Sequence, residues 1–310
     1  MSQSTSRLLY TGAEWDFDML KRVDEACAEI AIGELGLDVY PNRFDVVGSD
    51  GMLDVYASSG VPKYYDHWSF GKHFIMQETI YRKGFSGLAL EMVINSVPCI
   101  SYLMEQNTAT EQTTVIAHAA YGHNHFFKNN YLFKQWTDAL GVLDYFDYAK
   151  AYIAQCEERY GTREVERLLD AAHALKSHGV FRHSGKRHTN LRQEAERARD
   201  RALQAERDYN DLWAHTIPAA PAKNVQVLSA QRRKDILKLP EENILYFLEK
   251  YAPRLQTWQR EILRIVRNVA QYFYPQIQTQ VMNEGCATYV HYRIMRRLHE
   301  KGQISDGNYQ

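Results

Sequence analysis

Apolar side chains recur at helical spacing through most of the chain. Across residues 14–36 they form one stripe, which predicts an amphipathic helix that stops at Gly36. The same pattern predicts further helices over these stretches: from Ser49 to near Gly60, from Phe70 to Arg82 with Gly84 closing it, across Lys128–Gly179, over 253–275 with Pro275 ending it, and over 279–298.

Two shorter stretches have the pattern of β-strands. The first is "RFDVV" at 43–47, where apolar and polar residues alternate. The second is "LALEMVINSVPCISYLME" at 88–105, which is β-branched and apolar and which the turn signal "SVP" divides into two strands, with Glu91 on the first. Thr108 and Glu111 then have the spacing of a capping box, which predicts a helix from Ala109 through His118. Helices with one small sheet or hairpin indicate a predominantly helical α+β fold.

The chain divides into three parts by composition. An N-terminal part covers 1–181, a charged helical insertion and linker rich in Arg, Glu, Gln and Ala covers 182–239, and a helical part covers 240–310. Pro218 to Pro221 are typical of a loose linker, and Pro240 sits at a first helical turn, where order restarts.

Overall composition excludes several classes of protein. With 45% hydrophobic residues the chain can build a large core, and its 37 basic and 38 acidic residues give no electrostatic footprint for nucleic acid. No run of 18 uncharged apolar residues predicts a membrane span, and the acidic N-terminal 30 residues are not a signal peptide. The four cysteines lack C-x-x-C spacing and indicate reduced thiols. We therefore expect a soluble, cytoplasmic protein.

Two segments gather metal-ligand residues. "HAAYGHNH" holds His118, His123 and His125, and "NEGCATYVH" holds Glu284 and His291 about two helical turns apart on one face. Neutral imidazoles with a carboxylate are the ligand set that catalytic zinc and many iron sites prefer. Because His118 and His123 are five apart, a regular helix offsets them by about 140°, and they reach one ion only if the turn between them loosens.

Each of these residues also has a plainer interpretation that the sequence leaves open. The histidines can be structural, His125 can lie in the core or in solvent, and Glu91 can be an edge-strand glutamate that faces outward or a buried carboxylate near the site. We interpret Glu111 as a capping partner. In H-E-x-x-H zinc peptidases the general base follows the first histidine directly, whereas this chain has Ala119 there.

Two other groups of residues hold cationic or aromatic side chains. "HWSFGK" at 67–72 combines a cation, an aromatic and a glycine at a helix start and could bind an anion, although Trp68 is expected to be a core anchor. Arg260, Arg264 and Arg267 lie off the apolar stripe and are expected on a solvated face.

Several long motifs resemble the stage V sporulation protein R (SpoVR) family. They are "YPNRFDVV", "HWSFGK", "EMVINSVPCISYLME", "AHAAYGHNHFFKNN", "QCEERYG", "WQREILRIVR" and "MNEGCATYVHY", and they recur in the family's order from about residue 15 to 300. Family members continue well past the end of this sequence, so the resemblance implies a C-terminally truncated member. His125 is not usually histidine in the family, and the positions of Cys286 and Val290 more often hold tryptophan.

A more distant resemblance covers three elements only. The hairpin, the histidine helix and the Asn-Glu-Gly helix resemble a gluzincin-type zinc peptidase, which implies a zincin-like core. It implies that His118, His123 and Glu284 are metal ligands and that His291 is a fourth ligand or a transition-state donor. Because an alanine follows the first histidine, Glu91 is the expected general base.

The family resemblance implies a role in making the spore cortex, a peptidoglycan layer, or in stationary-phase stress. Our first hypothesis is a hydrolase of an amide-type bond that depends on a divalent metal, with zinc expected. The second is a non-catalytic regulatory or scaffold partner of a PrkA-type serine kinase and a von Willebrand A-type protein, whose genes neighbour those of the family. A third hypothesis is a redox-active iron site.

Overall fold

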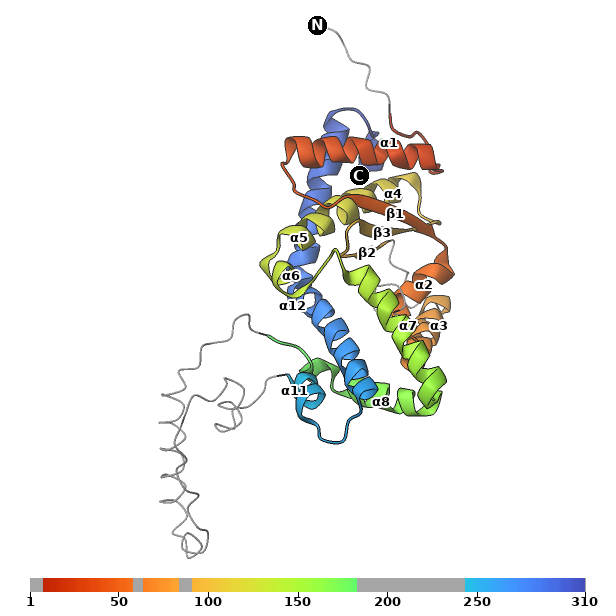
Figure 1. Cartoon of the computed structure of the whole chain (residues 1–310). Coiled ribbons are helices and arrows are strands. Elements are labelled where there is room, and N and C mark those ends of the chain that lie inside the picture. Colours follow the sequence, from red (N-terminus) through yellow and green to blue (C-terminus); the bar gives the residue numbers. More distant parts are fainter. Residues whose placement is uncertain (1–7, 58–63, 84–90, 183–242, 310) are drawn as a thin grey trace, which may run out of the picture.

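The computed structural model describes residues 8–57, 64–83, 91–182 and 243–309. Within these ranges, helices surround a three-stranded sheet (Figure 1). The predicted α+β fold with predominant helix is therefore confirmed. Nearly all of the predicted insertion at 182–239, and the restart at Pro240, lie outside the described residues.

The first predicted helix forms as expected. It comprises α1 (Phe17–Ala28) and a π-helical continuation, η1 (Glu29–Glu34). Asp16 caps its start, because its side chain accepts a hydrogen bond from the backbone N–H of Met19 at 2.6 Å. The chain then leaves the helix through Gly36, whose φ of 66° suits glycine.

The predicted hairpin is also present, and it has a third strand. β2 (Glu91–Ile94) and β3 (Cys99–Met104) pair antiparallel, with Glu91 opposite Leu103. β1 (Asn42–Val47), the predicted "RFDVV" strand, pairs parallel with β3, so the order is β1-β3-β2 and β2 is an edge strand. The parallel pairing was not predicted, because alternation within a strand does not reveal a partner far along the chain.

The remaining helices follow the predicted stretches closely. α2 begins at Ser49 and α3 ends at Arg82, as predicted, while the ends expected near Gly60 and Gly84 lie outside the described residues. The bounds are α2 (Ser49–Ala57), α3 (Trp68–Arg82), α4 (Ala109–Val115), η2 (Ile116–His123), α5 (Asn124–Asn129), α6 (Tyr131–Trp136), α7 (Val142–Tyr160), α8 (Thr162–Ala174), η3 (Lys176–His178), α11 (Ile244–Tyr251), α12 (Thr257–Glu300) and α13 (Asp306–Tyr309).

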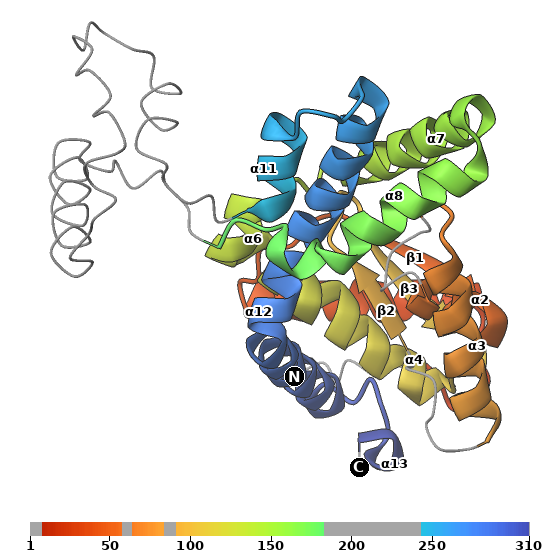
Figure 2. The same ribbon diagram turned by 90° about the horizontal axis from the view of Figure 1, so that it is seen from below.

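The sheet separates two hydrophobic cores. Ile94 and Ile100 join α7, α8, α11 and the first half of α12 in one core. Leu103 joins α1, η2 and the last turns of α12 in the other. Figure 2 shows the strands between α4 on one side and α7 and α8 on the other. α12 therefore contributes to both cores and runs past the sheet between them.

Pro275 does not end a helix, and this prediction was wrong. α12 continues through it as one helix of 44 residues, which joins the two helices predicted over 253–275 and 279–298. A proline inside a helix costs about 3 kcal/mol. Here Val269 and Ala270 are buried before it, and Thr279 and Asn283 are buried after it, so packing on both sides outweighs that cost.

The arginines at the start of α12 do not form a solvated face, which corrects a second prediction. Arg264 and Arg267 donate to the carboxylate of Glu249, a side chain of α11 that is only 1% exposed. Arg260 donates to the backbone carbonyls of Glu249 and Ala252. A buried carboxylate needs cations of this kind, and these contacts hold α11 against α12.

Two expectations from composition can be compared with the structure. All four cysteines are free thiols, and only Cys286 is not buried. Among the described residues, none of the helices combines the length and the hydropathy needed to cross a bilayer.

Candidate metal centre

A π-helical segment brings the two candidate histidines together. The capping box predicted at Thr108 and Glu111 is present and starts α4, so Glu111 is the capping partner expected. The helix then widens into η2, whose i→i+5 winding brings residues five apart onto one face. The rings of His118 and His123 lie 4.6 Å apart, centre to centre. The loosened turn that these two histidines require is therefore confirmed.

The close approach of α12 to η2 depends on Gly122. A Cβ atom at this position would lie 2.6 Å from Cα of Ala287 and 2.9 Å from its Cβ. Only glycine lets the two helices pack this closely. This contact sets the Asn283–Glu284 turn of α12 beside the histidines of η2.

Two glutamates place a carboxylate oxygen near Nε2 of both candidate histidines. Oε1 of Glu91 lies 3.4 Å from Nε2 of His118 and 3.8 Å from Nε2 of His123. Oε2 of Glu284 lies 3.6 and 3.8 Å from the same two nitrogens. The ligand atoms of Glu91, His118 and His123 all lie within 4.8 Å of one another. β2, η2 and α12 thus each contribute to one cluster.

Hydrogen bonds behind the rings orient them. Nδ1 of His123 lies 2.9 Å from Oδ1 of Asn283, and an amide oxygen only accepts, so this Nδ1 carries the proton and Nε2 presents a lone pair. Nδ1 of His118 lies 2.8 Å from Nδ1 of His291. His291 therefore contacts the back of His118, on the opposite side from Glu91. Partners of this kind fix the tautomer and angle of a ligand histidine.

The contacts between these rings and carboxylates are not ion pairs at neutral pH. Burial, then the neighbouring His123 and His291, lowers the pKa of His118 to about 3. Burial also lowers the pKa of His123 and of His291. Burial, with Glu284 nearby, raises the pKa of the Glu91 carboxyl to about 8. Its Oε2 is buried without a hydrogen-bond partner. The cluster consists of electron-pair donors that a cation would bring together.

The spacing fits a divalent ion. Zinc binds histidine nitrogen and carboxylate oxygen at about 2.0–2.2 Å, which separates tetrahedral ligand atoms by about 3.3–3.5 Å. The four nitrogen–oxygen distances of 3.4–3.8 Å are close to that range. Burial distinguishes the two carboxylates, because the side chain of Glu91 is 18% exposed and that of Glu284 is 54% exposed.

The structure separates some predicted residues from this cluster and adds one. His125 lies only two residues after His123, but its ring hydrogen-bonds to the backbone of Asp38 and to Asn129 instead of joining the candidate ligands. Asn283 was not assigned a role from the sequence, although it belongs to the Asn-Glu-Gly motif. Its position directly before Glu284 and its burial are the signal that an amide faces inward there.

The helix start at 67–72 is not an anion site in this structure. Trp68 is 53% exposed, so its prediction as a core anchor was wrong. The indole N–H donates to Asp170 at 2.6 Å, and Asp170 also lies 3.1 Å from Nε2 of His67, which caps the helix. An acidic side chain therefore lies where the anion was expected.

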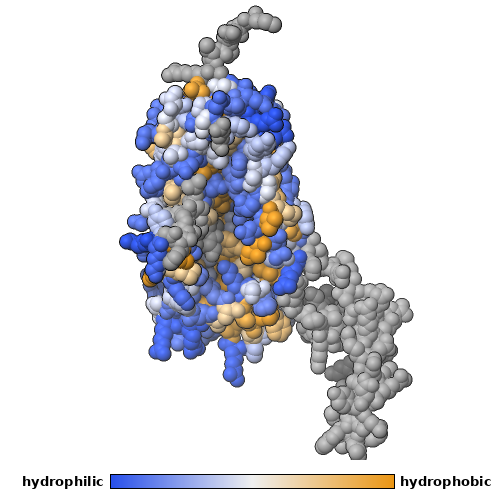
Figure 3. Space-filling view, turned by 180° about the vertical axis from the view of Figure 1, so that it is seen from behind, coloured by the Kyte–Doolittle hydropathy of each residue, from blue (hydrophilic) through white to orange (hydrophobic). Residues whose placement is uncertain are grey.

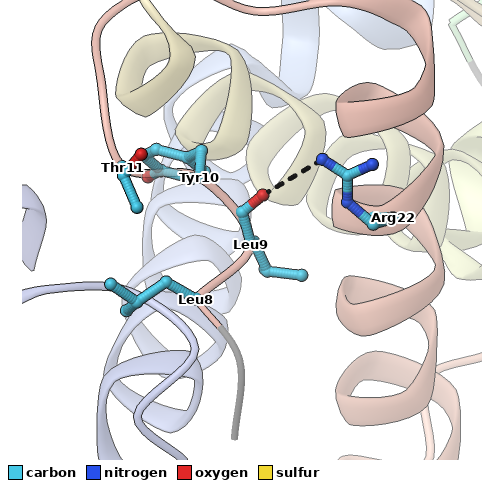
Figure 4. A pocket seen from close by; sticks show the side chains of 5 residues that line it. All are labelled: Leu8, Leu9, Tyr10, Thr11 and Arg22. Carbon is cyan, nitrogen blue, oxygen red and sulfur yellow. Dashed lines mark hydrogen bonds between the residues drawn. The ribbon is translucent and has the colours of Figure 1, made fainter.

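Two cavities elsewhere are not lined by the candidate ligands. One of about 560 Å³ lies between the N-terminal segment and α1, and Arg22 there donates to the Leu9 carbonyl at 3.4 Å (Figure 4). The other, of about 280 Å³, is lined by residues of α6, α7 and α12 and the turn before α7. The chemistry-bearing cluster therefore lies at the junction of β2, η2 and α12.

Comparison with known proteins agrees with the motifs. Residues 14–309 match the family described as SpoVR like protein. The uncharacterized protein YcgB of Escherichia coli strain K12 is 51% identical over 308 residues, which are 99% of this chain and 59% of that protein. The chain thus spans about three fifths of the length of that relative. No solved structure matches. The chain belongs to the SpoVR-like protein family.

Proposed function

We propose that this chain carries the centre of a metal-dependent hydrolase that cleaves an amide-type bond. The observation that carries the proposal is that Nε2 of His118 and Nε2 of His123 each lie 3.4–3.8 Å from one oxygen of Glu91 and one oxygen of Glu284, across β2, η2 and α12. Zinc is the expected ion and iron the alternative, because both accept histidine and carboxylate ligands.

The geometry leads us to assign the two glutamates differently from the zinc-peptidase resemblance. Glu91, His118 and His123 are the proposed ligands, because they are the more enclosed group and their ligand atoms lie within 4.8 Å of one another. Glu284 is the proposed general base, since a base must reach both water and substrate and this side chain is 54% exposed. Glu284 would thus supply the general base that H-E-x-x-H zinc peptidases have directly after the first histidine, where this chain has Ala119. His291 is a positioning residue behind His118 rather than a fourth ligand.

A bound divalent ion supplies Lewis acidity and makes water a stronger acid. Residues of the chain orient the ligand histidines and transfer the proton. Asn283 holds His123 in the tautomer that presents Nε2, and the hydrogen bond with His291 orients the ring of His118. Glu284 accepts the proton of the attacking water and returns it to the leaving amine.

The substrate class and location are part of the proposal. We place the bond in a peptidoglycan precursor because the family resemblance implies a role in the spore cortex, and we place the reaction in the cytoplasm. The alternative, a scaffold for a PrkA-type kinase and a von Willebrand A-type protein, rests on the family likeness alone. The scaffold alternative differs from the hydrolase proposal because it requires no catalytic turnover.

The test is metal content and turnover in three variants. Purified protein should hold about one zinc or iron per chain, and Glu91→Gln and His118→Ala should lose it. Glu284→Gln should keep most of the metal and lose amine release from soluble peptidoglycan fragments. His125→Ala is the matched control, because its ring bonds to the Asp38 backbone instead. Absence of metal from the unmutated chain would refute the proposal, and full metal without any turnover would leave the scaffold alternative.

A further inference from the structure

We infer that the cavity between α6, α7 and α12 binds an alkylated ammonium ion. Three aromatic residues, Trp136, Tyr145 and Tyr272, line this cavity together with Asp138, and the described residues that line it include no lysine, arginine or histidine. Aromatic rings and a carboxylate both attract a cation, and grouped aromatic rings are the usual recognition site of quaternary ammonium groups. The inference does not depend on the proposed metal centre, whose ligands do not line this cavity.

Hydrogen bonds and packing hold two of the aromatic side chains in place. The hydroxyl of Tyr145 accepts a hydrogen bond from Nδ2 of Asn268 at 2.9 Å. The hydroxyl of Tyr272 donates to the backbone carbonyl of Asn95 at 3.1 Å, and its ring packs edge-on against Phe146 with centroids 5.6 Å apart. Because both rings are ordered before a ligand arrives, binding costs little side-chain entropy.

The carboxylate of Asp138 is also held in place, and one of its oxygens remains available. Its Oδ1 accepts hydrogen bonds from the backbone N–H groups of Leu140 and Gly141, each at 3.2 Å. Within the described ranges of the chain, Oδ2 has no hydrogen-bond donor. A Cβ atom at Gly141 would lie 2.7 Å from Oδ2, so the carboxylate lies directly against the glycine backbone. Oδ2 can therefore pair with a cation while Oδ1 keeps the side chain in position.

Other polar groups that line the cavity already have partners. Oγ1 of Thr137 donates to the Phe133 carbonyl at 2.7 Å and accepts from Nδ2 of Asn95 at 3.0 Å. Both ends of the Gln271 amide bond to the backbone of Phe181. A sugar or another polyol needs several donors and acceptors that are not yet paired. A methylated ammonium ion has no N–H to satisfy and needs only rings and a carboxylate, so these residues favour the cation.

The size of the cavity limits the ligand. Pockets for drug-sized ligands have volumes of about 300–1,000 Å³, whereas this cavity has about 280 Å³. It therefore suits a trimethylammonium group on a short stem.

Hydrophobic surface elsewhere is less specific. Figure 3 shows one face hollowed along its middle, with hydrophobic residues in and beside the hollow. Such a surface does not determine the charge of a ligand, whereas a carboxylate among aromatic residues does.

The experiment compares choline with its uncharged carbon analogue, in which a tert-butyl group replaces the trimethylammonium group. Titration calorimetry should show that choline binds at least tenfold more tightly than the analogue, because only the charged group is attracted to rings and carboxylate. Asp138→Asn should weaken choline binding at least fivefold and leave binding of the analogue unchanged. This variant keeps the oxygen that accepts from the backbone. Asp144→Asn is the matched control, because Asp144 is an exposed acidic residue of α7 that does not line the cavity, and it should bind choline as the unmutated chain does.

A second pair of variants tests the aromatic ring of Tyr145. Tyr145→Leu should weaken choline binding at least fivefold, whereas Tyr145→Phe keeps the ring and should change it less than twofold. Circular dichroism should show that both variants remain folded. Equal losses in the two variants would mean that the hydroxyl, and not the ring, determines binding, and would overturn the inference.

The remaining outcomes decide the chemistry of the ligand. The inference is wrong if choline does not bind at concentrations of about 10 mM, if the uncharged analogue binds within twofold of choline, or if the two aspartate variants weaken choline equally. Preferential binding of N-acetylglucosamine would show a polyol site instead. A short peptide with one trimethyllysine, compared with the same peptide carrying lysine, identifies the source of the cation. If the trimethyllysine peptide binds more tightly than choline, the cation belongs to a methylated protein, and otherwise it is a free small molecule.

Discussion

Replacing Gly122 with alanine should push apart the two helices that carry the candidate metal centre. The added Cβ would lie 2.6 Å from Cα and 3.1 Å from the carbonyl oxygen of Ala287. Non-bonded carbon atoms prefer about 3.5–4.0 Å, so η2 and α12 must separate by roughly 1 Å. The opposing atoms include backbone, and so no rotation of a side chain relieves the contact.

The size of the effect follows from two opposing contributions. Overpacking of this kind costs about 1–3 kcal/mol or more, whereas replacing glycine by alanine inside a helix returns about 1 kcal/mol. The free energy of unfolding of Gly122→Ala should therefore fall by up to about 2 kcal/mol. Metal sites tolerate shifts of only about 0.2 Å in ligand distance, so zinc affinity should fall at least tenfold.

Gly285→Ala is a matched control in the same helix pair. Gly285 follows Glu284 directly, and a Cβ there would meet nothing within 4 Å. This variant should gain up to about 1 kcal/mol of stability from helix propensity and keep its zinc affinity. The assays are urea unfolding followed by circular dichroism and zinc competition against a chromogenic chelator. If Gly122→Ala unfolds at the same urea concentration and binds zinc equally well, glycine is not what sets the helix spacing.

Three further predictions concern side chains around and beyond the centre. His291→Ala should lower zinc affinity by about 10–100-fold by releasing the ring of His118, whereas His125→Ala should not, and equal affinities would contradict the positioning role. Burial, then His67, lowers the pKa of His173 to about 4 from 6.5. As pH falls from 6.5 to 4, the unfolded chain therefore protonates His173 before the folded chain does, and the free energy of unfolding drops by less than about 1.4 kcal/mol per pH unit. In urea titrations at several pH values, His173→Gln should lose stability with falling pH less steeply than the unmutated chain. An unchanged slope would contradict this. Glu249→Gln should destabilise the fold by about 2 kcal/mol, below the 3–5 kcal/mol of a fully buried pair, because Lys250 and Arg264, two of the three cations that contact Glu249, are 41 and 43% exposed. An unchanged urea midpoint would count against this.

Features set by neighbouring residues could be predicted from the sequence. The Asp16-capped first helix and the capping box at Thr108 follow from side chains that bond within one turn. The β2–β3 hairpin follows from β-branched and apolar residues on both sides of a turn signal. The passage of α12 through Pro275 was missed, because burial on both sides of the proline depends on residues of two separate cores.

The candidate centre was predicted in its residue types but not in its arrangement. The histidine and Asn-Glu-Gly segments are visible in the sequence, and five residues between His118 and His123 already required a widened helix. The distinction between an enclosed Glu91 and an exposed Glu284 is tertiary, since neither alternation nor helical spacing tells which carboxylate faces water. The same holds for His291, whose contact with His118 joins residues 173 apart.

The register of α12 links the fold to the candidate centre. Consecutive residues of a helix point about 100° apart, so Asn283 can face inward to His123 while Glu284 faces the centre and Val281 faces solvent. One residue of slippage would move all three to wrong faces at once. The contact of Gly122 with Ala287 opposes such slippage, because larger side chains of α12 do not fit against it at that distance. The close approach of these helices therefore aligns the proposed base and the residue that orients His123 at the same time.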